Sequence, residues 1–99
     1  MEVKIQAIHF DATEKLQAFI QKKLDKFGKY SDDVQKAHVV LKVEKPEAAK
    51  NKSTSIKLSV KKSELFAEKV CDTFEEGVDL CVDSLLRQLE KYKEKIRGK

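Results

Sequence analysis

The chain has 99 residues, of which 40% are hydrophobic and 38% are charged, and its formal net charge is +4. These values fit one small domain over residues 1–99. They argue against a membrane protein, because no apolar run approaches the roughly 18 residues that a bilayer helix needs. Acid and lysine interrupt the only apolar stretch near the start, so we expect no secretory signal and a cytoplasmic location.

The N-terminal part predicts a strand followed by a helix. Residues 2–8 alternate between apolar and polar side chains, as a half-buried strand does. Asp11 or Thr13 can cap the next segment, and Gly28 together with the polar residues 31–33 is expected to end it. Between these limits apolar residues recur at helical spacing, namely Leu16, Phe19, Ile20, Leu24 and Phe27.

Three further strands and a second helix are predicted after this point. Residues 34–45 are rich in β-branched side chains, residues 46–53 form a loop, and residues 54–61 alternate strictly. A tight break at Lys62–Ser63 predicts a hairpin with the segment that follows. Thr73 and Glu76 form a capping box for the last helix. Its apolar seam consists of Val78, Val82, Leu85, Leu89, Tyr92 and Ile96.

The predicted fold is therefore of the α+β class, with the order β-α-β-β-β-α. The most economical architecture is a four-stranded sheet with both helices packed on one face and the other face open.

Charge is unevenly distributed along the chain. Residues 44–62 hold six lysines and two glutamates, residues 63–86 hold one lysine and seven acids, and residues 87–99 hold six basic residues and two acids. Such blocks predict faces of different sign, and basic faces on small domains most often bind phosphates.

The last helix separates its charges around its axis. At 100° per residue, Arg87, Lys91 and Lys95 fall on one flank. The acids of the other flank are Asp79, Asp83, Glu90 and Glu94. Lys93 and Arg97 are predicted to pair with Glu90 and Glu94 at i,i+3. The basic flank is thus left without an acid of its own.

The first helix shows a similar stripe. Lys15, Lys22, Lys26 and Lys29 follow one line opposite its apolar face, and Lys23 lies nearer the buried side, where it can snorkel. A plainly solvated polar surface remains the alternative interpretation of both patterns.

Phosphate binding needs only suitably spaced cations. RNA is favoured over DNA, because no helix carries the exposed Asn, Gln and Arg array of a major-groove reader. Tyr30 and Tyr92 are expected to pack, which favours recognition of shape and phosphate over base stacking.

Nothing in the sequence indicates catalysis, and we expect no enzyme, cofactor or metal site. Phosphate loops, GxSxG and HExxH are absent from the sequence. Cys71 and Cys81 are interpreted as reduced, partly buried thiols, and His38 as structural. The rival hypothesis is a small enzyme that uses the acids of residues 72–83, although the first of these fit better as acids at a helix N-terminus.

Three segments resemble one known family. They are TEKLQAFIQKKLDKFGKYSDD (13–33), VVLKVEK (39–45) and, above all, VDLCVDSLLRQLEKYKEKI (78–96). All three resemble the ribosome hibernation promoting factor family, which includes the ribosome-associated inhibitor A and carries the older label sigma-54 modulation protein. The chain ends soon after the last helix, so it resembles a short form without a C-terminal dimerisation domain or an acidic tail.

The resemblance implies a fold similar to double-stranded RNA-binding domains. It also implies binding to the small ribosomal subunit and its ribosomal RNA near the decoding centre, with inhibition of translation in stationary phase or stress. A separate ribosome-dimerising factor is a further implied partner. The family's basic positions match Lys23, Lys26, Arg87, Lys91 and Lys95, and the lysine stripe adds Lys22 and Lys29 to the expected RNA-binding residues.

The sequence departs from the family pattern at two places. Ala7 and Ile8 replace a glycine and a polar or basic residue after the first strand, and Glu75 replaces a tyrosine. We therefore expect no RNA contact from either position. A general binder of structured RNA, without preference for ribosomes, remains the second hypothesis.

Overall fold

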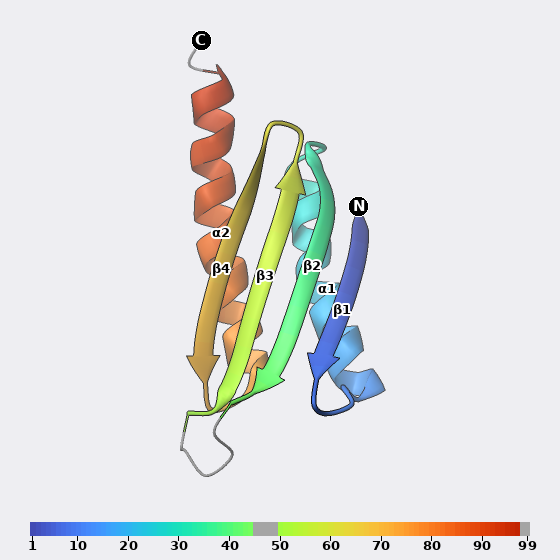
Figure 1. Cartoon of the computed structure of the whole chain (residues 1–99). Helices are drawn as coiled ribbons and strands as arrows, with labels where there is room; N and C mark the ends of the chain where they lie inside the picture. The colour runs from blue at the N-terminus through green and yellow to red at the C-terminus, as the bar shows by residue number, and fades with distance from the viewer. Residues whose placement is uncertain (45–49, 98–99) are drawn as a thin grey trace.

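The computed structural model describes residues 1–44 and 50–97, with the side chains of residues 96 and 97 outside the description. The elements are β1 (Glu2–Ile8), α1 (Glu14–Tyr30), β2 (Val34–Val43), β3 (Lys52–Val60), β4 (Ser63–Cys71) and α2 (Phe74–Arg97). The predicted β-α-β-β-β-α order is confirmed (Figure 1). Residues 46–49 of the loop expected at 46–53 lie outside the described residues, and its last two residues, Lys52 and Ser53, belong to β3 instead.

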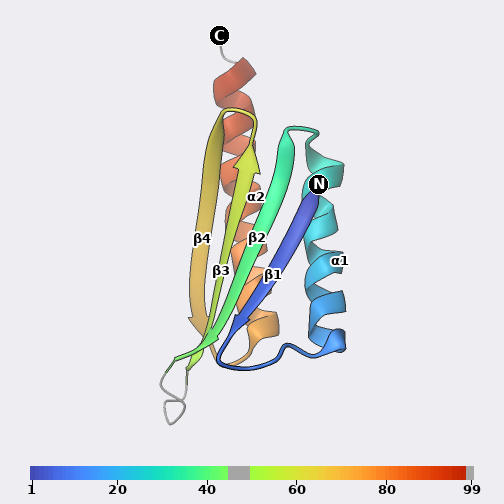
Figure 2. The same ribbon diagram turned by 45° about the vertical axis from the view of Figure 1, so that its right-hand side comes forward.

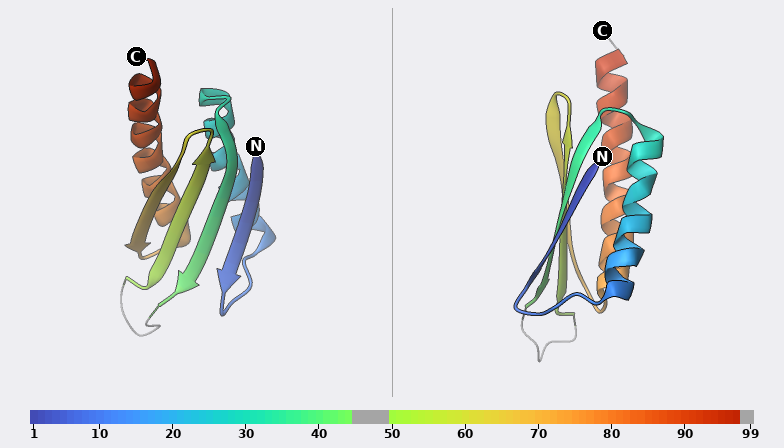
Figure 3. Two further views of the ribbon diagram at one scale, coloured as in Figure 1. Left: turned by 45° about the horizontal axis from the view of Figure 1, so that its top comes forward. Right: turned by 90° about the vertical axis from the view of Figure 1, so that its right-hand side faces the viewer.

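The four strands form one sheet in the order β1-β2-β3-β4. β1 pairs with β2 in parallel, and the other two pairs are antiparallel. A parallel pair needs a crossover connection, which α1 supplies. Both helices lie on the same face of the sheet, as predicted (Figures 2 and 3). The opposite face is not covered by any described element.

Helix α1 is capped by one of the two expected residues and ends at the polar residues 31–33, as predicted, with Ser31 as its C-cap. Thr13 has an extended backbone, and its Oγ1 accepts a hydrogen bond from the Leu16 N–H at 3.1 Å. Gly28 does not end the helix, and no described glycine has a positive φ. The helix continues to Tyr30 because Phe27 is fully buried and its carbonyl accepts the N–H of Ser31 at 3.0 Å.

The predicted hairpin between β3 and β4 is confirmed, with its turn one residue earlier than expected. Val60 pairs with Ser63, so Lys61 and Lys62 form the two-residue loop. This turn lies next to the last turns of α2 (Figure 1).

Helix α2 approaches β3 closely at Gly77. Thr73 caps the helix as predicted, since its Oγ1 accepts the Glu76 N–H at 3.1 Å, but the return bond of a capping box, from the Thr73 N–H to the Glu76 carboxylate, does not form between these described residues. A Cβ atom at Gly77 would lie 2.6 Å from Oγ1 of Thr54 on β3. Only glycine fits this contact without a shift of the helix or the strand, so the start of α2 is held tightly against the sheet.

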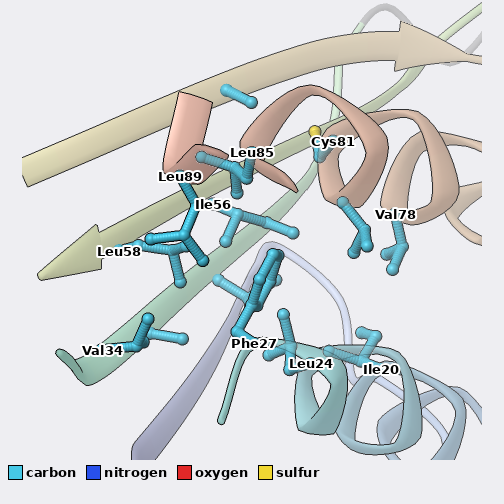
Figure 4. Packing of buried hydrophobic residues seen from close by; sticks show 14 of the residues in the cluster. Ile20, Leu24, Phe27, Val34, Ile56, Leu58, Val78, Cys81, Leu85 and Leu89 are labelled. Atoms are coloured by element: carbon cyan, nitrogen blue, oxygen red, sulfur yellow. The ribbon is translucent and has the colours of Figure 1, made fainter. Parts of the chain in front are cut away.

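The hydrophobic core lies between the sheet and the helix layer (Figure 4). The predicted seam of α2 is confirmed as far as Tyr92, and the side chain of Ile96 lies outside the described part. The largest fully buried apolar side chains are Ile20, Leu24, Phe27, Val39, Leu41, Ile56, Leu58, Val78, Leu85 and Leu89. Their burial fixes the rotation of both helices, and therefore which charged side chains reach the surface.

Candidate nucleic-acid interface

The predicted basic residues of α2 lie on the side of the helix that borders β4. Gln88 ties this side to the strand, because its Nε2 atom donates to the carbonyl oxygen of Phe66 at 2.9 Å. Lys91 and Lys95 are exposed and line a shallow hollow with the first residues of β4. Arg87 is exposed one turn before Lys91. We call Arg87, Lys91 and Lys95 the outer flank of α2.

Tyr92 joins the hairpin turn to the end of this flank. Its buried hydroxyl group accepts the backbone N–H of Lys62 at 3.3 Å and donates to Asp33 Oδ2 at 3.5 Å. Asp33 also lies 3.9 Å from Lys61 Nζ. The exposed Lys62 therefore lies beside the outer flank. The sequence does not predict this position, because a contact between residues 30 positions apart leaves no local pattern.

The opposite, inner side of α2 faces α1. Lys23 Nζ lies 3.0 Å from Asp79 Oδ1 and 5.4 Å from the centre of the Phe19 ring. The Lys23 side chain is only 29% exposed. Lys23 lies toward the buried side, as predicted, and its ammonium group is occupied in joining the two helices.

Lys93 also lies on this inner side, and its predicted ion pair with Glu90 is wrong. Its Nζ atom donates to the carbonyl oxygen of Tyr30 at 3.1 Å and lies 4.4 Å from the centre of that ring. A carbonyl at the end of α1 attracts a cation, which explains the choice of partner. The side chain of Arg97, predicted to pair with Glu94, lies outside the described residues.

The lysines of α1 form a second basic surface. Lys22, Lys26 and Lys29 are exposed and line a shallow hollow along the helix together with Phe19. Lys15 is exposed two turns earlier. We call Lys22, Lys26 and Lys29 the α1 stripe. Asp25, which lines the same hollow, accepts a hydrogen bond from the Gln21 side chain at 3.4 Å.

Acidic side chains separate the two basic surfaces. Asp79 faces α1 through its pair with Lys23, while Glu90 and Glu94 share a hollow with Tyr30 at the end of α1. The α1 stripe and the outer flank of α2 therefore do not form one continuous patch. A nucleic acid that contacts both must present phosphates on two sides of this acidic strip.

The thiols of Cys71 and Cys81 are expected to be unreactive. Burial raises the pKa of the Cys81 thiol to about 11, and burial followed by Glu76 raises that of Cys71. Both thiols are free and protonated at neutral pH, and the Cys81 thiol lies 3.5 Å from the carbonyl oxygen of Thr54. Protonated thiols are poor nucleophiles and poor metal ligands.

The acids of residues 72–83 do not gather into a site. Glu75 and Glu76 lie in the first turn of α2, where acids complement the helix dipole, and Asp79 pairs with Lys23. Within residues 1–44 and 50–97, no three histidine, cysteine, aspartate or glutamate residues are grouped as metal ligands would be. No helix in this part of the chain has the length and apolar character to cross a bilayer.

Comparison with known proteins shows that the whole chain is similar to ribosome hibernation promoting factors. The ribosome hibernation promoting factor of Escherichia coli is 31% identical over 97 residues, which cover 98% of each chain. The factor of the same name from Pseudomonas putida is 28% identical over 95 residues, covering 96% of this chain and 89% of the relative.

Two solved structures share the fold. A ribosomal subunit interface protein from Coxiella burnetii superimposes with a TM-score of 0.83 at 25% identity, covering 94% of this chain and 98% of that one. The N-terminal domain of Protein Y from Thermus thermophilus gives a TM-score of 0.80 at 22% identity, with 93% and 99% covered. Residues 3–97 match the family described as sigma 54 modulation protein / S30EA ribosomal protein, and the chain belongs to that family.

Proposed function

We propose that this protein is a ribosome hibernation factor that binds the small subunit near the decoding centre. There it occupies the sites of mRNA and tRNA and so inhibits translation in stationary phase or stress, without any chemical step. Full-length similarity to proteins named ribosome hibernation promoting factor supports the proposal, as does the similarity to a ribosomal subunit interface protein. Ribosome binding places the protein in the cytoplasm.

The observation that carries the proposal is that the basic side chains of the outer flank are exposed and unpaired within the part of the chain that the structure describes. Arg87, Lys91 and Lys95 are exposed, and none of them lies within 4.0 Å of a carboxylate among the described residues. Three cations held along one edge of a rigid helix match the repeating phosphates of folded RNA. Each phosphate neutralised releases counterions, so binding should weaken steeply with salt.

Of the seven residues expected to bind RNA, six are exposed and one, Lys23, is paired. The outer flank and the α1 stripe supply direct phosphate contacts, and the acidic strip between them directs two RNA segments to separate sides. Lys23 contributes indirectly, through its pair with Asp79 between the two helices. Pairing of silenced ribosomes is left to a separate dimerising factor.

Sedimentation tests this function directly. The wild-type protein is added to purified ribosomes and to separated subunits, and its position in a sucrose gradient is measured. We expect co-migration with the small subunit and weaker binding for the variant K91Q/K95Q. The matched control is K50Q/K69Q, which removes two exposed lysines from the other end of the sheet. Wild-type protein that stays at the top of the gradient would overturn the proposal.

General binding of structured RNA is the second candidate, because phosphate contacts carry no sequence information. An unrelated RNA duplex, added in excess to the binding reaction, separates the two. A ribosome-specific factor stays on the small subunit, whereas a general binder is displaced in proportion to the added duplex.

A further inference from the structure

The open face of the sheet carries one row of residues that the helix surfaces do not explain. Strand register places Lys4 beside His38, His38 beside Lys57, and Lys57 beside Phe66. Neighbouring strands are about 4.8 Å apart, so the row crosses all four strands within roughly 15 Å. Three of its members are basic and the fourth is aromatic.

The basic part of the row surrounds a shallow hollow. Lys4, Lys36, His38 and Lys57 line it together with Ser59 and the two acids Glu2 and Glu64. The Nε2 atom of His38 is buried and makes no hydrogen bond to a described residue. Like charges on neighbouring strands repel one another, and buried polar atoms normally have partners. Among the described residues, the one carboxylate within 4.0 Å of these lysines is that of Glu64, at 3.9 Å from Lys57 Nζ, so the ammonium groups of Lys4 and Lys36 stay available to a phosphate.

Phe66 ends the row on the edge strand β4. Its side chain is 54% exposed, and no described element covers this face of the strand. Glu64 and Glu68 lie two residues to either side of Phe66 and therefore on the same face. The ion pair between Glu64 and Lys57 is long, at 3.9 Å, and exposed, so it holds neither group firmly.

We propose that the open face of the sheet binds single-stranded RNA. One base stacks on the Phe66 ring, and the adjoining phosphates lie over Lys57, Lys36 and Lys4. An exposed aromatic ring beside a basic track is the arrangement by which proteins hold single strands. This inference rests on the proposed ribosome binding only for the identity of the RNA.

The two glutamates orient the nucleotide. Carboxylates beside Phe66 repel phosphate, so the backbone must lie toward β2 and β1 and the base toward β4. Carboxylate oxygens accept hydrogen bonds from the exocyclic amino group of cytosine. Uracil has a carbonyl oxygen at that position, so the face should bind oligocytidylate more tightly than oligouridylate.

Binding of labelled five-nucleotide RNAs to the full chain, measured by fluorescence anisotropy without ribosomes, tests the site. Phe66→Leu keeps an apolar side chain but removes the stacking surface, and we expect about tenfold weaker binding of oligocytidylate. Val70→Ala is the matched control, because Val70 is also exposed, at 45%, on the same strand and face. Equal binding by wild type and Phe66→Leu would overturn the proposal.

Two further arms complete the test. Glu68→Gln should reduce the preference for oligocytidylate, and equal binding of both RNAs by the wild type would refute the orientation.

Sedimentation equilibrium tests whether a second copy of the chain occupies the face instead. A dimer that Phe66→Leu dissociates, with unchanged RNA binding, would assign the face to a second copy of the chain.

These outcomes remain separable from the proposed function. If the wild-type protein sediments with ribosomes but does not bind the short RNAs, only this inference is contradicted. Protein that binds the RNAs through Phe66 yet stays at the top of the gradient contradicts only ribosome binding. Ultraviolet crosslinking on ribosomes freed of mRNA and on ribosomes carrying it then identifies the strand as ribosomal RNA or mRNA.

Discussion

Both the inner and the outer side of α2 carry basic residues, but these residues have different partners. On the inner side Asp79 pairs with Lys23 of α1, and Lys93 binds the carbonyl oxygen of Tyr30. On the outer flank Arg87, Lys91 and Lys95 remain exposed beside β4. The neighbouring element therefore decides whether a cation holds the fold together or stays available to a ligand.

Charge reversal of the outer flank is expected to have the largest effect. The variant R87E/K91E/K95E replaces attraction to phosphate with repulsion, and we expect roughly hundredfold weaker ribosome binding and loss of translation inhibition in vitro. Its thermal unfolding should be nearly unchanged, because the three side chains are exposed. Inhibition that survives the reversal would show that the outer flank is not the ligand-binding side.

Gly77→Ala should disturb the packing that presents both sides of α2. The new methyl group would meet Thr54 Oγ1 at 2.6 Å, so we expect destabilisation of about 1–3 kcal/mol despite the better helix propensity of alanine. Urea unfolding measures the change. The double variant G77A/T54A should recover part of the loss, whereas additive effects would mean that the contact is not the cause.

A double-mutant cycle on Lys23 and Asp79 tests the inner side. K23M, D79N and the double variant should give a coupling free energy below about 1 kcal/mol, because both side chains are partly exposed, at 29% and 51%. Ribosome affinity should fall less for K23M than for K91Q/K95Q. A larger loss for K23M would mean that Lys23 itself contacts RNA.

The smallest expected effect concerns the thiol on the buried side of α2. The pKa of Cys81 is raised by burial, from 9.0 to about 11, so the folded state favours the protonated thiol. The stability that this gives is fully present below pH 9 and is lost as the pH rises through about 11. Alkylation of the native protein at pH 8 should be very slow and should become rapid in denaturant. Fast native labelling would contradict the buried position.

The sequence was sufficient for features that depend on a single element. The periodicity of α2 placed Arg87, Lys91 and Lys95 on one flank, because apolar residues fix the rotation of the helix. The alternation of β3 and the cap at Thr73 were predicted for the same local reason. Of the two signals expected to end α1, the polar residues 31–33 were right and Gly28 was wrong, because burial of Phe27 carries the helix beyond the glycine.

Features that depend on two elements were not predictable. Lys93 was assigned to Glu90 on its own helix, but the end of α1 offers a carbonyl and a ring at closer range. Lys62 reaches the outer flank only through Tyr92. Phe66 was overlooked because aromatic residues are usually buried. The inward positions of Leu65 and Ala67 would have placed it outside.

The most direct test of the account is a cryo-electron microscopy map of this protein bound to ribosomes. We predict density on the small subunit near the decoding centre, overlapping the paths of mRNA and tRNA, with Arg87, Lys91 and Lys95 against ribosomal RNA phosphates. Density elsewhere on the ribosome, or an outer flank that faces solvent in the complex, would contradict the account.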